Sequence, residues 1–180
     1  MSTANPIPIT FREVVSVFER IAENHQEINS FHSGFLDEVD IKKLGLKDYA
    51  ILYIEPSTVN VNVGVLSYSF TVYVMDLADD EKIGMSAFTN TGDVKNQRIG
   101  RRDTWNETLL IMQDVISEFR QSLITESYAN YKQQLFIQMP VNVEPYTARF
   151  NNLLTGWSAG FTLDVNNINE ICNIPITDPV

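Results

Sequence analysis

The side chains best suited to catalysis or metal binding are few and widely spaced in this 180-residue chain. His25 and His32 are seven residues apart and lack the paired-histidine-plus-glutamate spacing of a zinc-binding helix. Cys172 is the single cysteine, so no disulfide can form within the chain. A catalytic thiol there would need a base, and both histidines are distant in sequence. We expect the histidines to have surface or capping roles and Cys172 to be a small buried apolar residue.

Two clusters of acidic residues are the next candidates for a metal site. They consist of Asp76, Asp79, Asp80 and Glu81 in one case and of Asp37, Glu38 and Asp40 in the other. Neither has the spacing of oxygen ligands and turn glycine that a calcium loop requires, so we expect solvated loops. The chain also has no glycine-rich phosphate loop and no nucleophile elbow. The sequence therefore predicts no catalytic residue, no metal, no cofactor and no enzyme activity.

One cluster of basic residues is conspicuous in a chain with 13 basic and 23 acidic residues and a net charge of -10. It consists of Lys95, Arg98, Arg101 and Arg102. Dedicated DNA binding is disfavoured, because it needs an excess of cations. The cluster could be solvated loop charge, a phosphate contact or a docking site for an acidic surface, since arginine pairs with carboxylates through two hydrogen bonds. In the docking interpretation, Asp37, Glu38 and Asp40 of a neighbouring copy form the other half of the interface.

Length and composition indicate one globular domain. The chain is 44% hydrophobic and 20% charged, which are ordinary values for a folded protein. The start lacks a signal peptide, and no apolar stretch approaches the roughly 18 residues that span a bilayer. We therefore expect no membrane contact and synthesis in a cytoplasm. We divide the chain into an extended N-terminal arm (1–9), a single domain (10–165) and an extended C-terminal tail (166–180).

The first half of the domain has one helix and three strands. Thr10 and Glu13 form a capping-box pattern before an apolar stripe of helical spacing, which predicts a helix over 10–29. Residues 30–47 have no sustained period and are interpreted as a connecting segment. Strands are predicted over 49–55, 58–65 and 68–76, with a turn at Leu66-Ser67. The second strand alternates valine with polar residues, a pattern typical of a half-buried strand.

The second half has one helix and two strands. Residues 77–103 are polar and are interpreted as a long loop. Thr104 and Glu107 repeat the capping-box pattern, so a second helix is predicted from Thr104, with an apolar face so broad that it should pack between the sheet and another surface. Strands are predicted over 135–143, where Pro140 indicates an edge or a bulge, and from Pro145 to Val165.

These elements predict an α+β fold in the order α-β-β-β-α-β-β, with a mostly antiparallel sheet of about five strands packed on two main helices. Inward-facing positions follow from the period of each element. The predicted core consists of Val72, Val74, Trp157, Phe161 and Leu163 on the sheet and of Phe18, Leu109 and Phe119 on the helices.

The element order and length resemble the tail-terminator and tail-completion proteins of tailed bacteriophages over roughly residues 10–176. Three segments carry the resemblance: the helix end at 25–31, the strand at 68–76, and the stretch 153–161 leading to Cys172-Asn173-Ile174-Pro175. The family implies a non-enzymatic subunit of a neck or tail ring. Its partners would be copies of itself and other phage neck, portal or tail proteins. It would be assembled in the host cytoplasm and located in the virion, with genomic DNA passing through without specific binding.

This chain departs from the family pattern in its longer loop at 77–103 and its proline-bearing tail. The particular ring, whether a terminator, a connector or another tail ring, therefore stays open. Two other classes also stay open: a virion structural or adaptor protein that forms no ring, and a small-ligand-binding domain. The latter would need polar groups converging in an apolar pocket, and no sequence feature marks one.

Overall fold

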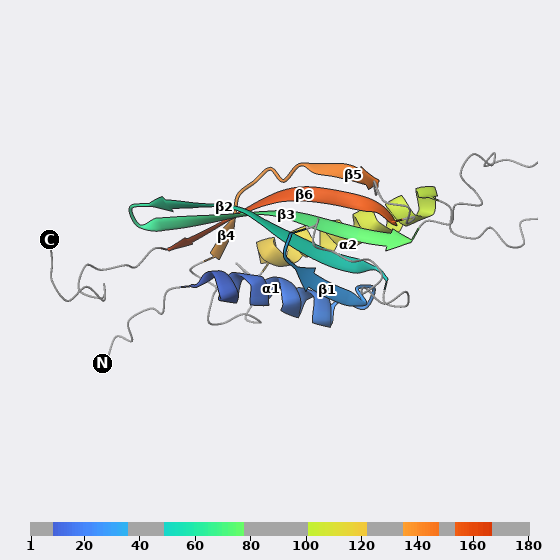
Figure 1. The fold of residues 1–180 in the computed structure, drawn as a ribbon, viewed down its shortest axis with the longest axis horizontal. Coiled ribbons are helices and arrows are strands. Elements are labelled where there is room, and N and C mark those ends of the chain that lie inside the picture. The colour runs from blue at the N-terminus through green and yellow to red at the C-terminus, as the bar shows by residue number, and fades with distance from the viewer. Residues whose placement is uncertain (1–8, 36–48, 78–100, 122–134, 148–153, 167–180) are drawn as a thin grey trace, which may run out of the picture.

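The computed structural model describes residues 9–35, 49–77, 101–121, 135–147 and 154–166. Two helices pack on one face of a six-stranded mixed sheet (Figure 1). In chain order the elements are α1 (Phe11–Asn24), β1 (Ser30–Ser33), β2 (Ile51–Asn62), β3 (Val65–Leu77), α2 (Arg101–Gln121), β4 (Leu135–Ile137), β5 (Val143–Thr147) and β6 (Leu154–Asn166). The predicted α+β class and mostly antiparallel sheet are confirmed.

The sheet has the order β1-β2-β3-β6-β4, and β5 also pairs with β6. Among the strands of the described residues, only β1 and β2 pair in parallel. The long central pair of β3 and β6 runs in register from Val65 opposite Asn166 to Leu77 opposite Leu154. Because β3 occupies one edge of β6, the short strands β4 and β5 follow one another along the other edge.

Helix α1 begins as predicted. The Thr10 hydroxyl accepts from the Glu13 backbone N–H at 3.4 Å, and the Glu13 carboxylate accepts from the Thr10 N–H at 2.6 Å. The helix ends at Asn24 rather than near residue 29, because His25 takes an extended conformation. The chain then turns so that the Asn29 N–H donates to the carbonyl of Ala50 at 2.9 Å. Residues from Ser30 continue as β1, a strand that the sequence did not predict.

The strands predicted over 49–55 and 58–65 form one continuous strand, β2. Strand β2 runs through Pro56, with a register shift between Pro56 and Thr58 where the chain bulges. A bulge on an outer strand tolerates the missing proline N–H. The turn into β3 lies at Val63-Gly64 rather than Leu66-Ser67, because Gly64 supplies the positive φ of 79° that the turn needs.

Three further predictions are corrected in the second half. Helix α2 begins at Arg101, so Thr104 lies within the helix, buried, instead of capping it. Leu110 is 51% exposed, so the broad apolar face is not buried all round. The third correction concerns the last strands. Of the strand expected over 135–143, only β4 and the first residue of β5 are present, although its edge position is confirmed, and the single strand expected from Pro145 to Val165 is instead divided between β5 and β6, which pair antiparallel.

The core lies between the helices and the sheet face that they cover. Phe18 is at its centre, with ring centroids 4.7 Å from Phe119, 5.5 Å from Phe70 and 5.8 Å from Phe161. The predicted core residues of the sheet and of the two helices are buried, with two exceptions. Trp157 and Leu109 are only partly buried. Ile9, placed in the arm by its sequence, is 4% exposed and joins this core.

Candidate interaction surface

The predicted charge-paired interface lies mostly outside the described residues. Arg101 and Arg102 form the first turn of α2. Lys95, Arg98 and the acidic group of Asp37, Glu38 and Asp40 fall in ranges that the structure does not describe. The pairing of this basic cluster with that acidic group therefore stays a prediction.

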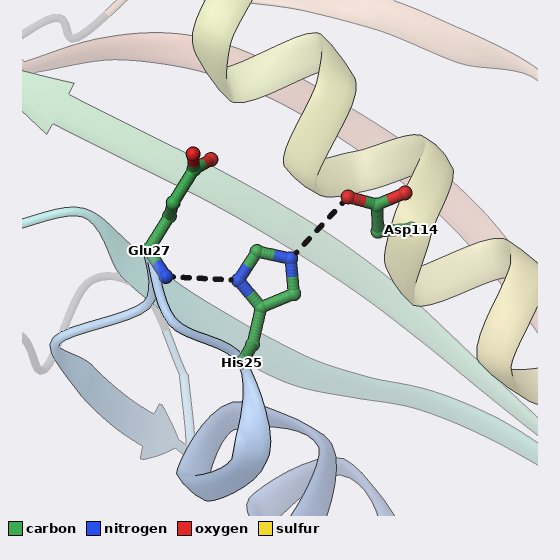
Figure 2. A network of polar contacts seen from close by, with 3 residues as sticks. All are labelled: His25, Glu27 and Asp114. Carbon is green, nitrogen blue, oxygen red and sulfur yellow. Dashed lines mark hydrogen bonds and ion pairs between the residues drawn. The ribbon is translucent and has the colours of Figure 1, made fainter.

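His25 has a capping role, as predicted. Its Nδ1 accepts from the backbone N–H of Glu27 at 3.2 Å, and its Nε2 lies 3.4 Å from Oδ2 of Asp114 (Figure 2). The Glu27 carboxylate points away from the ring in this view. The imidazole thus connects the end of α1 to the exposed side of α2. This arrangement positions the end of α1 against α2.

The other candidates for chemistry are dispersed. His32 lies on β1, where burial lowers the pKa of its ring. Asp76 is at the end of β3, where burial raises the pKa of its carboxyl even though the Leu77 N–H donates to it at 2.6 Å. Cys172 and the acidic residues at 79–81 lie outside the described ranges. Within the described ranges, no three histidine, cysteine, aspartate or glutamate side chains are grouped to hold a metal.

A hydrogen-bonded pair of tryptophans fixes α2 to the sheet. The Trp105 indole N–H donates to the hydroxyl of Thr155 at 2.6 Å, and the Trp157 N–H donates to the Trp105 carbonyl at 2.7 Å. The Thr155 hydroxyl in turn donates to the carbonyl of Tyr146 at 3.1 Å. These contacts join α2, β6 and β5. Their groups satisfy one another, so the arrangement is best explained as structural.

The sheet face opposite the helices has a smaller cluster rich in tyrosine. Ile51, Tyr53 and Met75 are buried there, and Tyr73 packs beside them. The Tyr73 hydroxyl donates to Glu55 at 3.3 Å. Burial, followed by the charge of Glu55, raises the pKa of Tyr73 to about 12. A phenol held so firmly in its protonated form is poorly suited to act as a base near neutral pH.

The most distinctive surface is the outer part of the β2–β3 hairpin, residues 58–68, which we call the outer hairpin. Figure 1 shows it extending past the beginning of α1. Val59, Val61 and Val63 are 49%, 72% and 105% exposed, increasing toward the turn. The sequence predicted a half-buried strand at these positions, and the structure leaves its apolar side uncovered.

The outer hairpin also lies within a long uncharged stretch. No charged residue occurs between Glu55 and Asp76, although the chain as a whole carries a net charge of -10. Soluble proteins seldom expose a contiguous apolar surface without a partner for it. The signal was present in the sequence as alternating valine and asparagine, but only the fold shows that no element within the described residues covers the valines.

Neither the known protein-family models nor the curated protein sequences match this chain. Among the described residues, no helix is both long and apolar enough to cross a membrane. The function must therefore be inferred from the surfaces of the molecule itself and from the sequence pattern of its core elements.

Proposed function

We propose that this chain is a structural subunit of a bacteriophage neck or tail ring, either a tail terminator or a head–tail connector, that joins or caps the tail and lets DNA pass. The observation that carries the proposal is the exposed, uncharged valine surface of the outer hairpin. A ring forms when one surface patch of each copy binds a different patch of the next and the rotation closes. An apolar projection on an acidic protein is suited to such a contact.

The phage assignment rests on the sequence resemblance, and the position of the resembling segments supports it. The segment 68–76 forms most of β3, and 153–161 includes the first half of β6. These two strands are paired at the centre of the sheet. The segment at 25–31 includes His25, which connects the two helices, and the start of β1. The resemblance thus involves the residues that build the scaffold.

The charge of the chain supports a passive relation to DNA. A net charge of -10 gives a surface that repels phosphate, and a ring around a moving DNA molecule must not bind it. In this proposal the chain is not an enzyme and needs no cofactor. Its partners are copies of itself and the adjoining neck, portal or tail proteins, and its location is the virion after assembly in the host cytoplasm.

The test is electron microscopy of the purified chain, together with immunogold labelling of virions of the phage that encodes it. Closed rings and gold at the junction of head and tail are expected. Gold over the capsid surface, with no rings, would favour a virion protein that forms no ring. A monomer that labels no part of the virion and binds a metabolite would refute the proposal and favour the ligand-binding alternative.

A further inference from the structure

We propose that the outer hairpin is the surface through which one copy of this chain binds a second copy, with its valines packed on the neighbour and the open edge of β2 paired with neighbouring backbone. This inference rests on the proposed function in taking the partner to be another copy of the chain. It assigns the contact to particular residues, which the ring proposal alone does not.

The apolar side of the outer hairpin continues the face of the sheet that the helices cover. Val59 lies opposite Tyr68 in the ladder, and Val61 lies opposite Leu66. Tyr68 and Leu66 both belong to the core on the helix side. Helix α1 begins at Phe11, whose ring lies 6.1 Å from that of Tyr68. The core on the helix side therefore ends near Tyr68 and Leu66. Val59 is half-exposed, and Val61 and Val63 toward the turn are exposed.

The backbone of the outer hairpin has an open edge. Strand β1 pairs with β2 only from Ile51 to Ile54, and the last contact is the Gly34 N–H donating to the Ile54 carbonyl at 3.1 Å. Beyond that point, β2 pairs within the described residues with β3 alone. Residues 57–62 are exposed along their length. Such an edge is a template for pairing with another strand.

The two edges of the sheet differ in how they are protected. The edge formed by β4 and β5 is interrupted and carries Pro140, Pro145 and Glu144, features that block pairing with another chain. The outer part of β2 after Pro56 has no proline and no charge. Natural proteins usually protect an exposed strand edge with prolines, charges or bulges. We therefore infer that this edge, which has no charge and no proline after Pro56, is paired when copies assemble.

Charge favours another copy over a basic protein as the partner. A basic protein would be attracted to the acidic parts of this chain rather than to a neutral hairpin. A second copy carries the same net charge of -10, so the two can approach most closely where charge is absent. The stretch between Glu55 and Asp76 is such a place. The neutral hairpin therefore matches the chemistry of a like-charged partner.

The experiment compares two charge variants of the full chain by analytical ultracentrifugation. Val61→Asp/Val63→Asp adds two charges on the apolar side and turn of the outer hairpin, whereas the control Asn106→Asp/Gln113→Asp adds two charges at exposed polar positions of α2, outside the proposed contact. Replacing two valines that the proposed contact would bury is expected to weaken self-association by about 100-fold or more. The control should stay within about 10-fold of the parent chain, since exposed charges away from the contact contribute little. Circular dichroism and thermal melting establish that each variant is folded.

Hydrogen exchange of the parent chain at low and high concentration tests the edge directly. Amides of residues 58–62 should gain protection as copies associate. The inference is overturned if the folded valine variant assembles like the parent, in which case rings persist and the proposed function survives. It is also overturned if residues 58–62 gain no protection in the oligomer. A parent chain that stays monomeric at all concentrations would refute both the inference and the ring.

Discussion

Replacing Gly156 with alanine should destabilise the domain strongly, because β3 and β6 approach too closely there for a side chain. A Cβ atom on Gly156 would lie 1.9 Å from the Val74 carbonyl oxygen and 3.1 Å from the Met75 Cα. These atoms belong to backbone, so no rotamer change can relieve the clash. The φ of 157° at Gly156 is also one that residues with side chains rarely adopt.

The size of the destabilisation depends on the backbone that would have to move to make room for the Cβ atom. Residues on either side of Gly156 belong to the longest ladder of the sheet, which is continuous from Val65 to Leu77 on β3. Separating the strands at one point strains the neighbouring pairs as well. Overpacking costs about 1–3 kcal/mol where side chains can adjust. With backbone on the other side we expect about 3 kcal/mol or more, which corresponds to roughly 6–12 °C in melting temperature for a domain of this size.

Gly160→Ala is the matched control, since it lies on the same strand and gains the same methyl group. A Cβ atom there meets nothing within 4 Å. We expect no loss, and a gain of up to about 1 kcal/mol from the reduced freedom of the unfolded chain. Thermal and urea unfolding of both variants provide the measurement. If Gly156→Ala melts at the temperature of the parent chain, the close approach of β3 and β6 is wrong.

Three other changes test separate parts of the fold by the free energy of unfolding. Trp157→Phe keeps most of the ring packing but loses the N–H that donates to a carbonyl of α2, so it should cost about 0.5–1.5 kcal/mol; no loss would exclude that hydrogen bond. Asp76→Asn should be more stable than the parent at pH 7. Burial raises the pKa of Asp76 above its ordinary 3.8, so folding favours the protonated carboxyl. The stability that the protonated Asp76 contributes is therefore present below pH 3.8 and is lost as the pH rises through the raised pKa. The advantage should therefore vanish below pH 3.8, and an advantage independent of pH would contradict the assignment; asparagine can still accept from Leu77. Thr10→Ala should cost about 1 kcal/mol and Thr10→Ser much less, whereas equal losses would show that the hydroxyl is not the cap.

The sequence predicted best those elements whose signals are local. The cap formed by Thr10 and Glu13 depends on residues three apart, and it forms as predicted. The alternation that predicted Val72, Val74, Phe161 and Leu163 as core residues reflects the period of a strand alone, and all four are buried. Such patterns need no knowledge of what lies across the sheet.

The errors concern contacts between distant parts of the chain. Strand β1 has four residues and exists because residues 51–54 lie beside it in parallel, which no local period indicates. Pro56 suggested a break between strands, but a bulge beside it lets β2 continue. Thr104 matched a capping pattern, yet the helix begins three residues earlier and buries it. The candidate interface chosen from charge alone lies largely outside the described residues.

The outer hairpin is a different case, because its sequence pattern predicts buried valines whereas the structure exposes them. Alternating valine and asparagine predicted a half-buried strand, and the structure pairs Val61 with Leu66 on the side that such a strand would bury. Val61 is nevertheless 72% exposed. Among the described residues no layer covers this two-stranded extension, so it gains little from its valines, since burial of apolar area is what stabilises a sheet. Threonine at these positions would serve an isolated domain equally well and expose less apolar surface. The contact that we propose between copies would bury these valines, and it would account for a pattern that the fold of the described residues does not explain.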